Sequence, residues 1–247
     1  MSFSKVKTLL LHIPHSGREF FKSQREHQDL FLDRARNLID YYTDELFSPD
    51  VKNKQIIPVV FPYCRPVCDV ERMTNDPLEE KNLGIQYDKH NHIPKYGFLN
   101  IDGKEFSSDN SIREYIKHHH MVESIIFNNK VDLVIDCHSF SSQPTVVLPN
   151  CKDLEKYDIC IGFNEDETKP CKVMLSVIID YFSKCGYKVG VNTPFSNSKT
   201  FNTPCSYFSF MIEVNKRLYM DEDSLEKTDG FNTIHKQLLD LYSKLMD

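Results

Sequence analysis

The sequence lacks the features that mark membrane-spanning and nucleic-acid-binding proteins. No apolar run reaches the roughly 20 residues that a helix needs to cross a bilayer. Positive charge is not in excess either, because 36 acidic residues outnumber 30 Lys and Arg, for a formal net charge of −6. A basic patch is the usual footprint of nucleic-acid binding. We therefore expect neither a membrane nor a nucleic acid as a partner.

Signals for export and for disulfide bonding are also missing. The first residues, MSFSKVKTLLLHIPHSG, contain only a short apolar run and no small-residue cleavage site, unlike a signal peptide. The eight cysteines are scattered and include no Cys-x-x-Cys pair, although Cys64 and Cys68 have a spacing that is a weak metal signal. We expect a cytoplasmic protein whose cysteines are reduced thiols, since disulfides are rare in that compartment.

Neither an internal repeat nor a low-complexity linker divides the 247 residues, which predicts a single domain over residues 1–247. Strand-like apolar segments alternate with segments of helical periodicity. This order predicts an α/β fold with a central mixed β-sheet flanked by helices on both faces. Pro58 has no amide proton to donate, so its strand should lie at an edge or a bulge. The expected strands are 8–13, 55–61, 66–72, 131–137, 145–149, 159–163, 188–192 and 208–214, and the expected helices are 30–47, 111–129, 170–186 and 230–246.

Polar side chains follow or interrupt three of the expected strands. His15 follows the first strand, His138 comes at the end of the segment VDLVIDCHSF, and Glu213 lies inside the apolar segment FSFMIEV. Ligands of α/β sheets bind at the carboxyl ends of the strands. A carboxylate among apolar residues is costly to bury unless it is paired or bound to a metal. Two histidines and a carboxylate therefore suggest a metal ion and a general base.

A catalytic zinc site needs this set of residue types. Such a site usually has three His or carboxylate ligands and an open position for water, while a further carboxylate serves as general base. Asp40 and Asp44 lie four residues apart on the expected helix 30–47, so either could supply the third ligand. The residues alone leave ordinary alternatives open, because strand-end histidines are often structural and an acidic pair is often the solvated face of a helix. The three histidines at 118–120 cannot converge on one ion, because consecutive helical positions point about 100° apart. Of the three, His119 is in line with Tyr115, Val122 and Ile126, so we expect it on the apolar side of its helix.

The whole set of motifs resembles the N-formylglutamate amidohydrolases. The segments HIPHSGREF, LIDYYTDELF, CRPVCDVERM, VIDCHSF, VNTPF and IEVNKRLYMDE occur in that order over nearly the whole chain. The segment EYIKHHHMVESI is also similar to a helix of that family that carries tyrosine and histidine. The resemblance implies a fold like that of the zinc carboxypeptidases and aspartoacylases. It implies zinc-dependent cleavage of the amide of an N-formyl or N-acyl amino acid such as N-formyl-L-glutamate, which gives formate or another acid and the free amino acid.

The resemblance also assigns roles to individual residues. His15, Asp44 and His138 would bind one Zn2+ ion per chain, with Asp40 as the alternative to Asp44. Nickel, cobalt and iron are other metals that such ligands accept. Glu213 would be the general base. A small-molecule substrate would be bound by Arg65, Arg72 and Asn192, since a guanidinium can hold a carboxylate through two parallel hydrogen bonds.

Two segments depart from the family pattern. The residues Asp69-Val70-Glu71-Arg72 stand where the family usually has Asp-Leu-Asn-Arg, and the segment FSNSKT lacks a glycine pair that usually follows VNTPF. Both departures fall in expected substrate-binding segments, so the acyl group and the amino acid stay open. The alternatives are a peptidase of the zinc carboxypeptidase type and a non-enzymatic metal-binding or ligand-binding relative. Retention of the expected ligands and of Glu213 argues against the non-enzymatic alternative.

Overall fold

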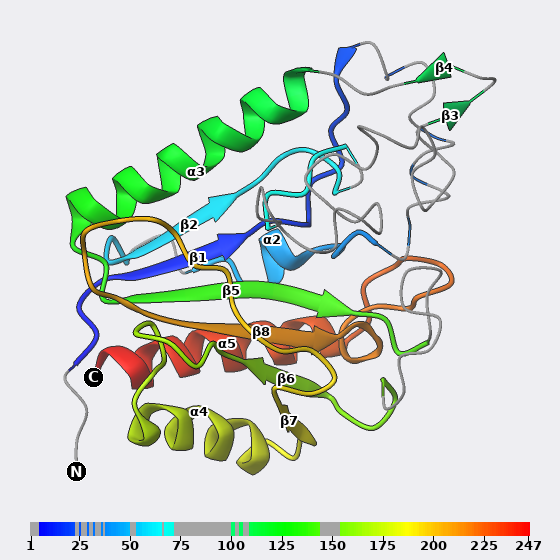
Figure 1. The fold of residues 1–247 in the computed structure, drawn as a ribbon. Helices are drawn as coiled ribbons and strands as arrows, with labels where there is room; N and C mark the ends of the chain where they lie inside the picture. The colour runs from blue at the N-terminus through cyan, green and yellow to red at the C-terminus, as the bar shows by residue number, and fades with distance from the viewer. Residues whose placement is uncertain are drawn as a thin grey trace.

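A six-stranded sheet forms the centre of the protein in its computed structural model (Figure 1). The structure describes residues 5–22, 25, 29, 32, 36, 38–49, 53–65, 67–71, 100–101, 104–105, 109–143 and 154–247. The expected strand 145–149 and the expected substrate ligand Arg72 lie outside the described residues.

The sheet is mixed, because two of its strands run against the other four. The strand order is β2-β1-β5-β8-β6-β7, in which β2, β1, β5 and β8 are parallel, β6 is antiparallel to β8, and β7 is parallel to β6. Pro58 lies in β2 at the edge of the sheet, as predicted. The strands are β1 (Leu9–Ile13), β2 (Ile56–Val60), β5 (Leu133–Phe140), β6 (Ile159–Gly162), β7 (Val189–Val191) and β8 (Phe208–Asn215), and a separate hairpin pairs β3 (Asn100–Ile101) with β4 (Lys104–Glu105).

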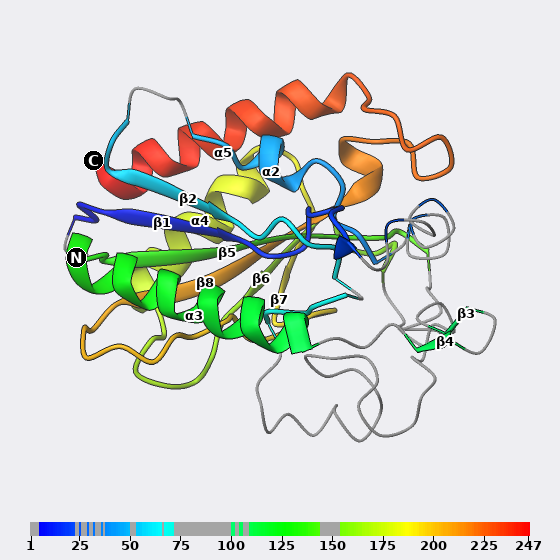
Figure 2. The same cartoon turned by 90° about the horizontal axis from the view of Figure 1, so that it is seen from above.

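Helices cover both faces of the sheet, which confirms the predicted architecture (Figure 2). Helix α3 (Asp109–Asn129) lies on one face, and α2 (Thr43–Leu46), α4 (Lys172–Lys184) and α5 (Gly230–Met246) lie on the other. None of the helices in the described part of the chain is both long and apolar enough to cross a membrane.

The alternation of side chains along β1 and β5 decides which residues face which helices. Leu10 and Val134 pack with Val122 and Ile126 of α3 in one apolar cluster. The alternate residues of each strand, such as Leu11 next to Leu10, project to the other face and join the larger core that includes α4 and α5. His12, Asp136 and His138 follow the pattern of Leu10 and Val134, so they are directed to the face that α3 covers.

Two expected elements differ from the structure. Residues 67–71 form turns in place of a strand, because the amides of Val67 and Cys68 both donate to the carbonyl of Cys64. In the region 30–47, the structure assigns a continuous described helix only to α2, which begins at Thr43. Asp40 therefore precedes α2 and does not share a helical face with Asp44.

Candidate metal centre

The carboxyl ends of the parallel strands bring the predicted residues together. In the sheet register, His12 lies opposite Asp136, and His138 lies opposite Glu213. His15 follows β1 by two residues. Residues paired in neighbouring strands project from the same face, so these side chains gather on the face that α3 covers. All five are buried.

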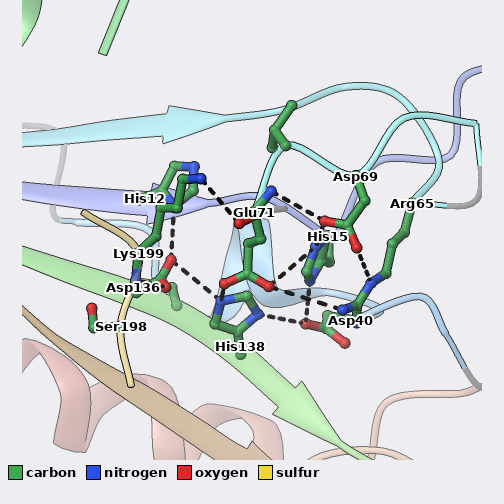
Figure 3. Close-up of polar contacts among 12 residues, drawn as sticks. His12, His15, Asp40, Arg65, Asp69, Glu71, Asp136, His138, Ser198 and Lys199 are labelled. Carbon is green, nitrogen blue, oxygen red and sulfur yellow. Dashed lines mark hydrogen bonds and ion pairs between the residues drawn. The ribbon is translucent and has the colours of Figure 1, made fainter. Parts of the chain in front are cut away.

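The imidazoles of His15 and His138 face each other, with ring centroids 4.9 Å apart (Figure 3). A carboxylate oxygen lies against the Nε2 atom of each ring. Nε2 of His15 is 2.9 Å from Oδ1 of Asp69, and Nε2 of His138 is 3.2 Å from Oδ1 of Asp136. Only the contact of His15 is a hydrogen bond. Metal-binding histidines commonly have a carboxylate beside the second ring nitrogen, which holds the ring in place.

Asp40 lies on the Nδ1 side of both rings. Its Oδ2 atom is 3.2 Å from Nδ1 of His138 and 3.7 Å from Nδ1 of His15. The amide of Asp40 donates to the carbonyl of His15, so the backbone also holds the two residues together. Asp40 is buried, with only 3% of its surface exposed.

Asp44 does not lie beside the histidines. Its side chain is exposed on α2, and it lines a surface cavity of about 550 Å³ with Ser16, Gly17 and Arg18. The sequence expectation treated residues 30–47 as one helix on which Asp40 and Asp44 were equivalent. Because α2 begins only at Thr43, the structure brings Asp40 to the histidines and leaves Asp44 outside.

Glu71 is a second carboxylate at the histidine pair, and it was absent from the predicted set. His15, Glu71 and His138 each offer one ligand atom. These three atoms lie within 4.8 Å of one another, so this trio could hold a metal ion. Oε1 of Glu71 is 2.9 Å from Nε2 of His138, and its Oε2 is 3.5 Å from Nε2 of His15. The only signal in the sequence was the replacement of the usual family asparagine by an acid at this position.

The donor set fits a divalent cation. Among the described residues, Nδ1 of His15, Nε2 of His138 and Oε2 of Glu213 are buried atoms of this site without a hydrogen-bond partner. Although burial acts to raise the pKa values of Asp40 and Asp136, their contacts with neighbouring histidines lower both. These carboxyl groups are therefore ionised, and a cation would compensate the buried negative charge.

The contacts of the rings decide which nitrogens are available to such a cation. An ionised carboxylate only accepts hydrogen bonds. Nε2 of His15 therefore carries the proton that it shares with Asp69, which leaves the Nδ1 lone pair without a partner. In His138 the recorded hydrogen bond joins Nδ1 to Oδ2 of Asp40, whereas Nε2, which lies beside Asp136 and Glu71, has no hydrogen-bond partner among the described residues. A cation held between Nδ1 and Asp40 would take the place of the proton that these two atoms share.

Glu213 differs from Asp40 and Asp136 because its pKa is raised, whereas theirs are lowered. It lies on β8 beside His138 and is 8% exposed. Burial raises the pKa of Glu213 to about 8, against the opposing effect of the charge of His138. A group with such a pKa can accept and return a proton near neutral pH.

We predict that Glu213→Gln stabilises the metal-free protein in a pH-dependent way. The unfolded carboxyl group loses its proton near its ordinary pKa of 4.5, whereas the folded one keeps it to about pH 8. Between these values the unfolded state binds fewer protons, so the stability contributed by this group falls as pH rises. The amide variant lacks this loss. Its Tm advantage over the parent should grow from pH 4.5 to pH 8 and then level off. A pH-independent advantage would contradict the prediction, and Glu226→Gln at an exposed position is the control.

The predicted substrate residues differ in their relation to the site. Arg65 lies beside it, with Nε donating to Oδ2 of Asp69 at 2.9 Å. Asn192 follows β7, which is separated from β8 by β6, and its Oδ1 atom accepts a hydrogen bond from the amide of Phe163. Arg65 thus supports the carboxylate that holds His15, while Asn192 shapes a loop at a different strand end.

Comparisons with known proteins show the family and the fold of this chain. The family model described as N-formylglutamate amidohydrolase matches residues 7–220. The chain is similar to the crystal structure of N-formylglutamate amidohydrolase from Ralstonia eutropha JMP134, with a TM-score of 0.72 and 18% identity over 98% of this chain and 94% of that one. It is also similar to a gene product of Agrobacterium tumefaciens, with a TM-score of 0.62 and 15% identity over 98% and 91% of the two chains. No curated protein sequence matches it.

Proposed function

Because the chain belongs to the N-formylglutamate amidohydrolase family, we propose that it is a zinc-dependent enzyme that hydrolyses the amide of an N-formyl or other N-acyl amino acid. The observation that carries the proposal is the buried pair of His15 and His138, with carboxylates on both sides of the rings and Glu213 on the adjoining strand. The products would be formate, or another carboxylic acid, and the free amino acid.

We assign the zinc ion to Nδ1 of His15, Nδ1 of His138 and the carboxylate of Asp40. This choice is supported by the carboxylates of Asp69 and Asp136, which lie beside the two Nε2 atoms and so leave the Nδ1 atoms as the ligand atoms. Glu71 with the same histidines is the second candidate set, supported by its contacts on the Nε2 side. A zinc ion bound at such a site supplies an acidified water and polarises the substrate carbonyl.

Glu213 is the residue that moves the proton in this proposal. As a carboxylate, it takes a proton from the attacking water on one oxygen and later gives it to the nitrogen of the leaving amine. Its Oε2 atom is not engaged by any described residue, so it is available for this exchange. Burial limits the contact of this group with bulk water and raises its pKa to about 8, so the group can exchange a proton near neutral pH.

The test is release of free amine from a panel of N-formyl and N-acetyl amino acids. We expect activity on at least one member, loss of that activity with a chelator, and recovery when Zn2+ is returned. A dipeptide with a free C-terminus belongs in the panel, because preferential cleavage of the peptide would indicate a carboxypeptidase. Chelator-resistant hydrolysis would contradict zinc dependence, and a metal-loaded protein inactive on every member would contradict the proposed activity.

Replacement of Arg65 should affect substrate binding more than turnover. The guanidinium already donates from Nε to Asp69, and its planar fork can hold a second carboxylate while a lysine ammonium cannot do both. Arg65→Lys should raise KM by on the order of tenfold, the equivalent of one charged hydrogen bond. Arg217→Lys is a matched control, since Arg217 forms an ion pair with Asp158. An unchanged KM for the best substrate would make Arg65 a purely structural residue.

A further inference from the structure

A chain of buried side chains connects helix α3 with the candidate metal centre. Nε2 of His118 on α3 is 2.9 Å from Nε2 of His12 on β1. Nδ1 of His12 is 2.7 Å from Oδ1 of Asp136 on β5, and the same oxygen is 3.2 Å from Nε2 of His138. Figure 3 shows His12, Asp136 and His138 in a row. None of the four side chains is more than 3% exposed.

Hydrogen bonds hold the members of this chain together. Asp136 accepts one from Nδ1 of His12, because a carboxylate has no proton to donate. Nε2 of His12 and Nε2 of His118 share a second one, and the tautomers of the two rings decide which of them donates. Burial lowers the pKa of His118 to about 2, so this ring is neutral. Two buried hydrogen bonds thus connect helix α3 with Asp136.

The surroundings hold each member in place. Oδ2 of Asp136 accepts from the amide of Lys199 at 2.9 Å, so both oxygens of this carboxylate are engaged. The rings of Phe61 and Phe201 meet His118 and His12 edge-on at centroid distances of 5.0 and 5.1 Å. Removal of His118 would leave Nε2 of His12 buried without its partner, and removal of His12 would take from Asp136 one of the hydrogen bonds that orient it.

We propose that His118 and His12 are positioning residues of the metal centre. They hold Asp136 with Oδ1 3.2 Å from Nε2 of His138, and this contact orients the ring so that Nδ1 faces Asp40. The inference rests on the proposed function for the presence of a metal and goes beyond it in coupling helix α3 to the site. Partners of this kind typically change metal affinity by 10- to 100-fold.

The first test is metal affinity, measured by competition with a chelator of known affinity. His118→Leu removes the hydrogen bond to His12 and should weaken Zn2+ binding by about 10- to 100-fold. His118→Gln keeps an amide that can donate or accept a hydrogen bond and should stay within about threefold of the parent, on the scale set by that range. His120→Leu, on an exposed face of the same helix, is the control and should bind like the parent.

The second test reads the ring nitrogens of His138 directly, by 15N NMR of the zinc-loaded protein. The parent should show zinc on Nδ1 and a proton on Nε2, and His118→Leu should show a different Nδ1 shift, because the ring is no longer held in the same orientation. If His118→Leu does not fold, His12→Asn and His12→Phe replace it. The asparagine amide can donate to Asp136 and should retain the parental Nδ1 shift, while phenylalanine should not.

The outcomes separate this inference from the proposed function. A parent protein that binds zinc but hydrolyses no member of the panel would contradict the proposed function, and the zinc affinities of the variants would still decide the inference. A folded His118→Leu with a lower Tm but with the parental zinc affinity and the parental Nδ1 shift of His138 would overturn the inference and leave His118 a structural residue.

Discussion

Glu213→Gln should lower kcat by about 10²- to 10⁴-fold while the protein stays folded and keeps its metal. The glutamine has nearly the same size and can hydrogen-bond, but it cannot accept a proton from water. Glu213 is placed for that role by β8, opposite His138, and Oε2 is buried without a hydrogen-bond partner among the described residues. The measurement is kcat on the best substrate of the panel, alongside metal content and Tm.

The control and the contradicting outcomes for this variant are well separated. Glu226→Gln makes the same chemical change at an exposed position and should leave kcat unchanged. Activity within a few-fold of the parent in a folded, metal-loaded Glu213→Gln protein would end the assignment of a general base. Loss of metal together with activity would instead identify Glu213 as a ligand.

Asp40→Asn should remove the metal, and Asp44→Asn should not. Oδ2 of Asp40 faces both Nδ1 atoms of the histidine pair, whereas Asp44 is exposed on α2. The loss of a direct ligand should exceed the 10- to 100-fold effect of an outer partner. The two substitutions make the same chemical change four residues apart, so each is the control of the other. Metal analysis after dialysis gives the result.

Glu71→Gln completes this comparison. If the ion lies on the Nδ1 side of the rings, Glu71→Gln should keep one metal per chain and Asp40→Asn should lose it. The reverse pattern would assign the ion to the trio of His15, Glu71 and His138. Loss of metal from Asp44→Asn alone would contradict the geometry that brings Asp40 to the histidines.

The strands and the residues at their ends were predictable from the sequence because both depend on local patterns. Apolar runs determined the core strands, and His138 and Glu213 were recognisable as polar groups within such runs. In a parallel sheet, strand ends meet at one edge, so the sequence also predicted that these residues converge. The place of Pro58 at the sheet edge followed from its missing amide proton.

The carboxylates were harder to predict, because they depend on where loops go. A choice between Asp40 and Asp44 required knowing that α2 begins at Thr43, and the helical pattern of residues 30–47 did not reveal this. Asp69 and Glu71 follow turns whose path across the sheet edge is set by tertiary contacts, such as that of His119 with the carbonyl of Val70. No local pattern encodes such contacts.

The helical histidines show the same limit. Position on the α3 helix indicated that His119 faces the apolar side, and it is partly buried. The more deeply buried member is His118, which is 3% exposed and contacts His12. Helical periodicity identified the face, but the partner across the sheet decided which histidine joined the buried chain.

The most direct measurement is a titration of metal-free protein with Zn2+ while amide hydrolysis of the best N-acyl amino acid is followed. Activity should rise in proportion to added zinc and stop rising at one ion per chain. The variant His138→Ala, which lacks one of the two central imidazoles, should stay inactive at that stoichiometry. Full activity of the metal-free protein, or parental zinc dependence in His138→Ala, would contradict a metal centre built on His15 and His138.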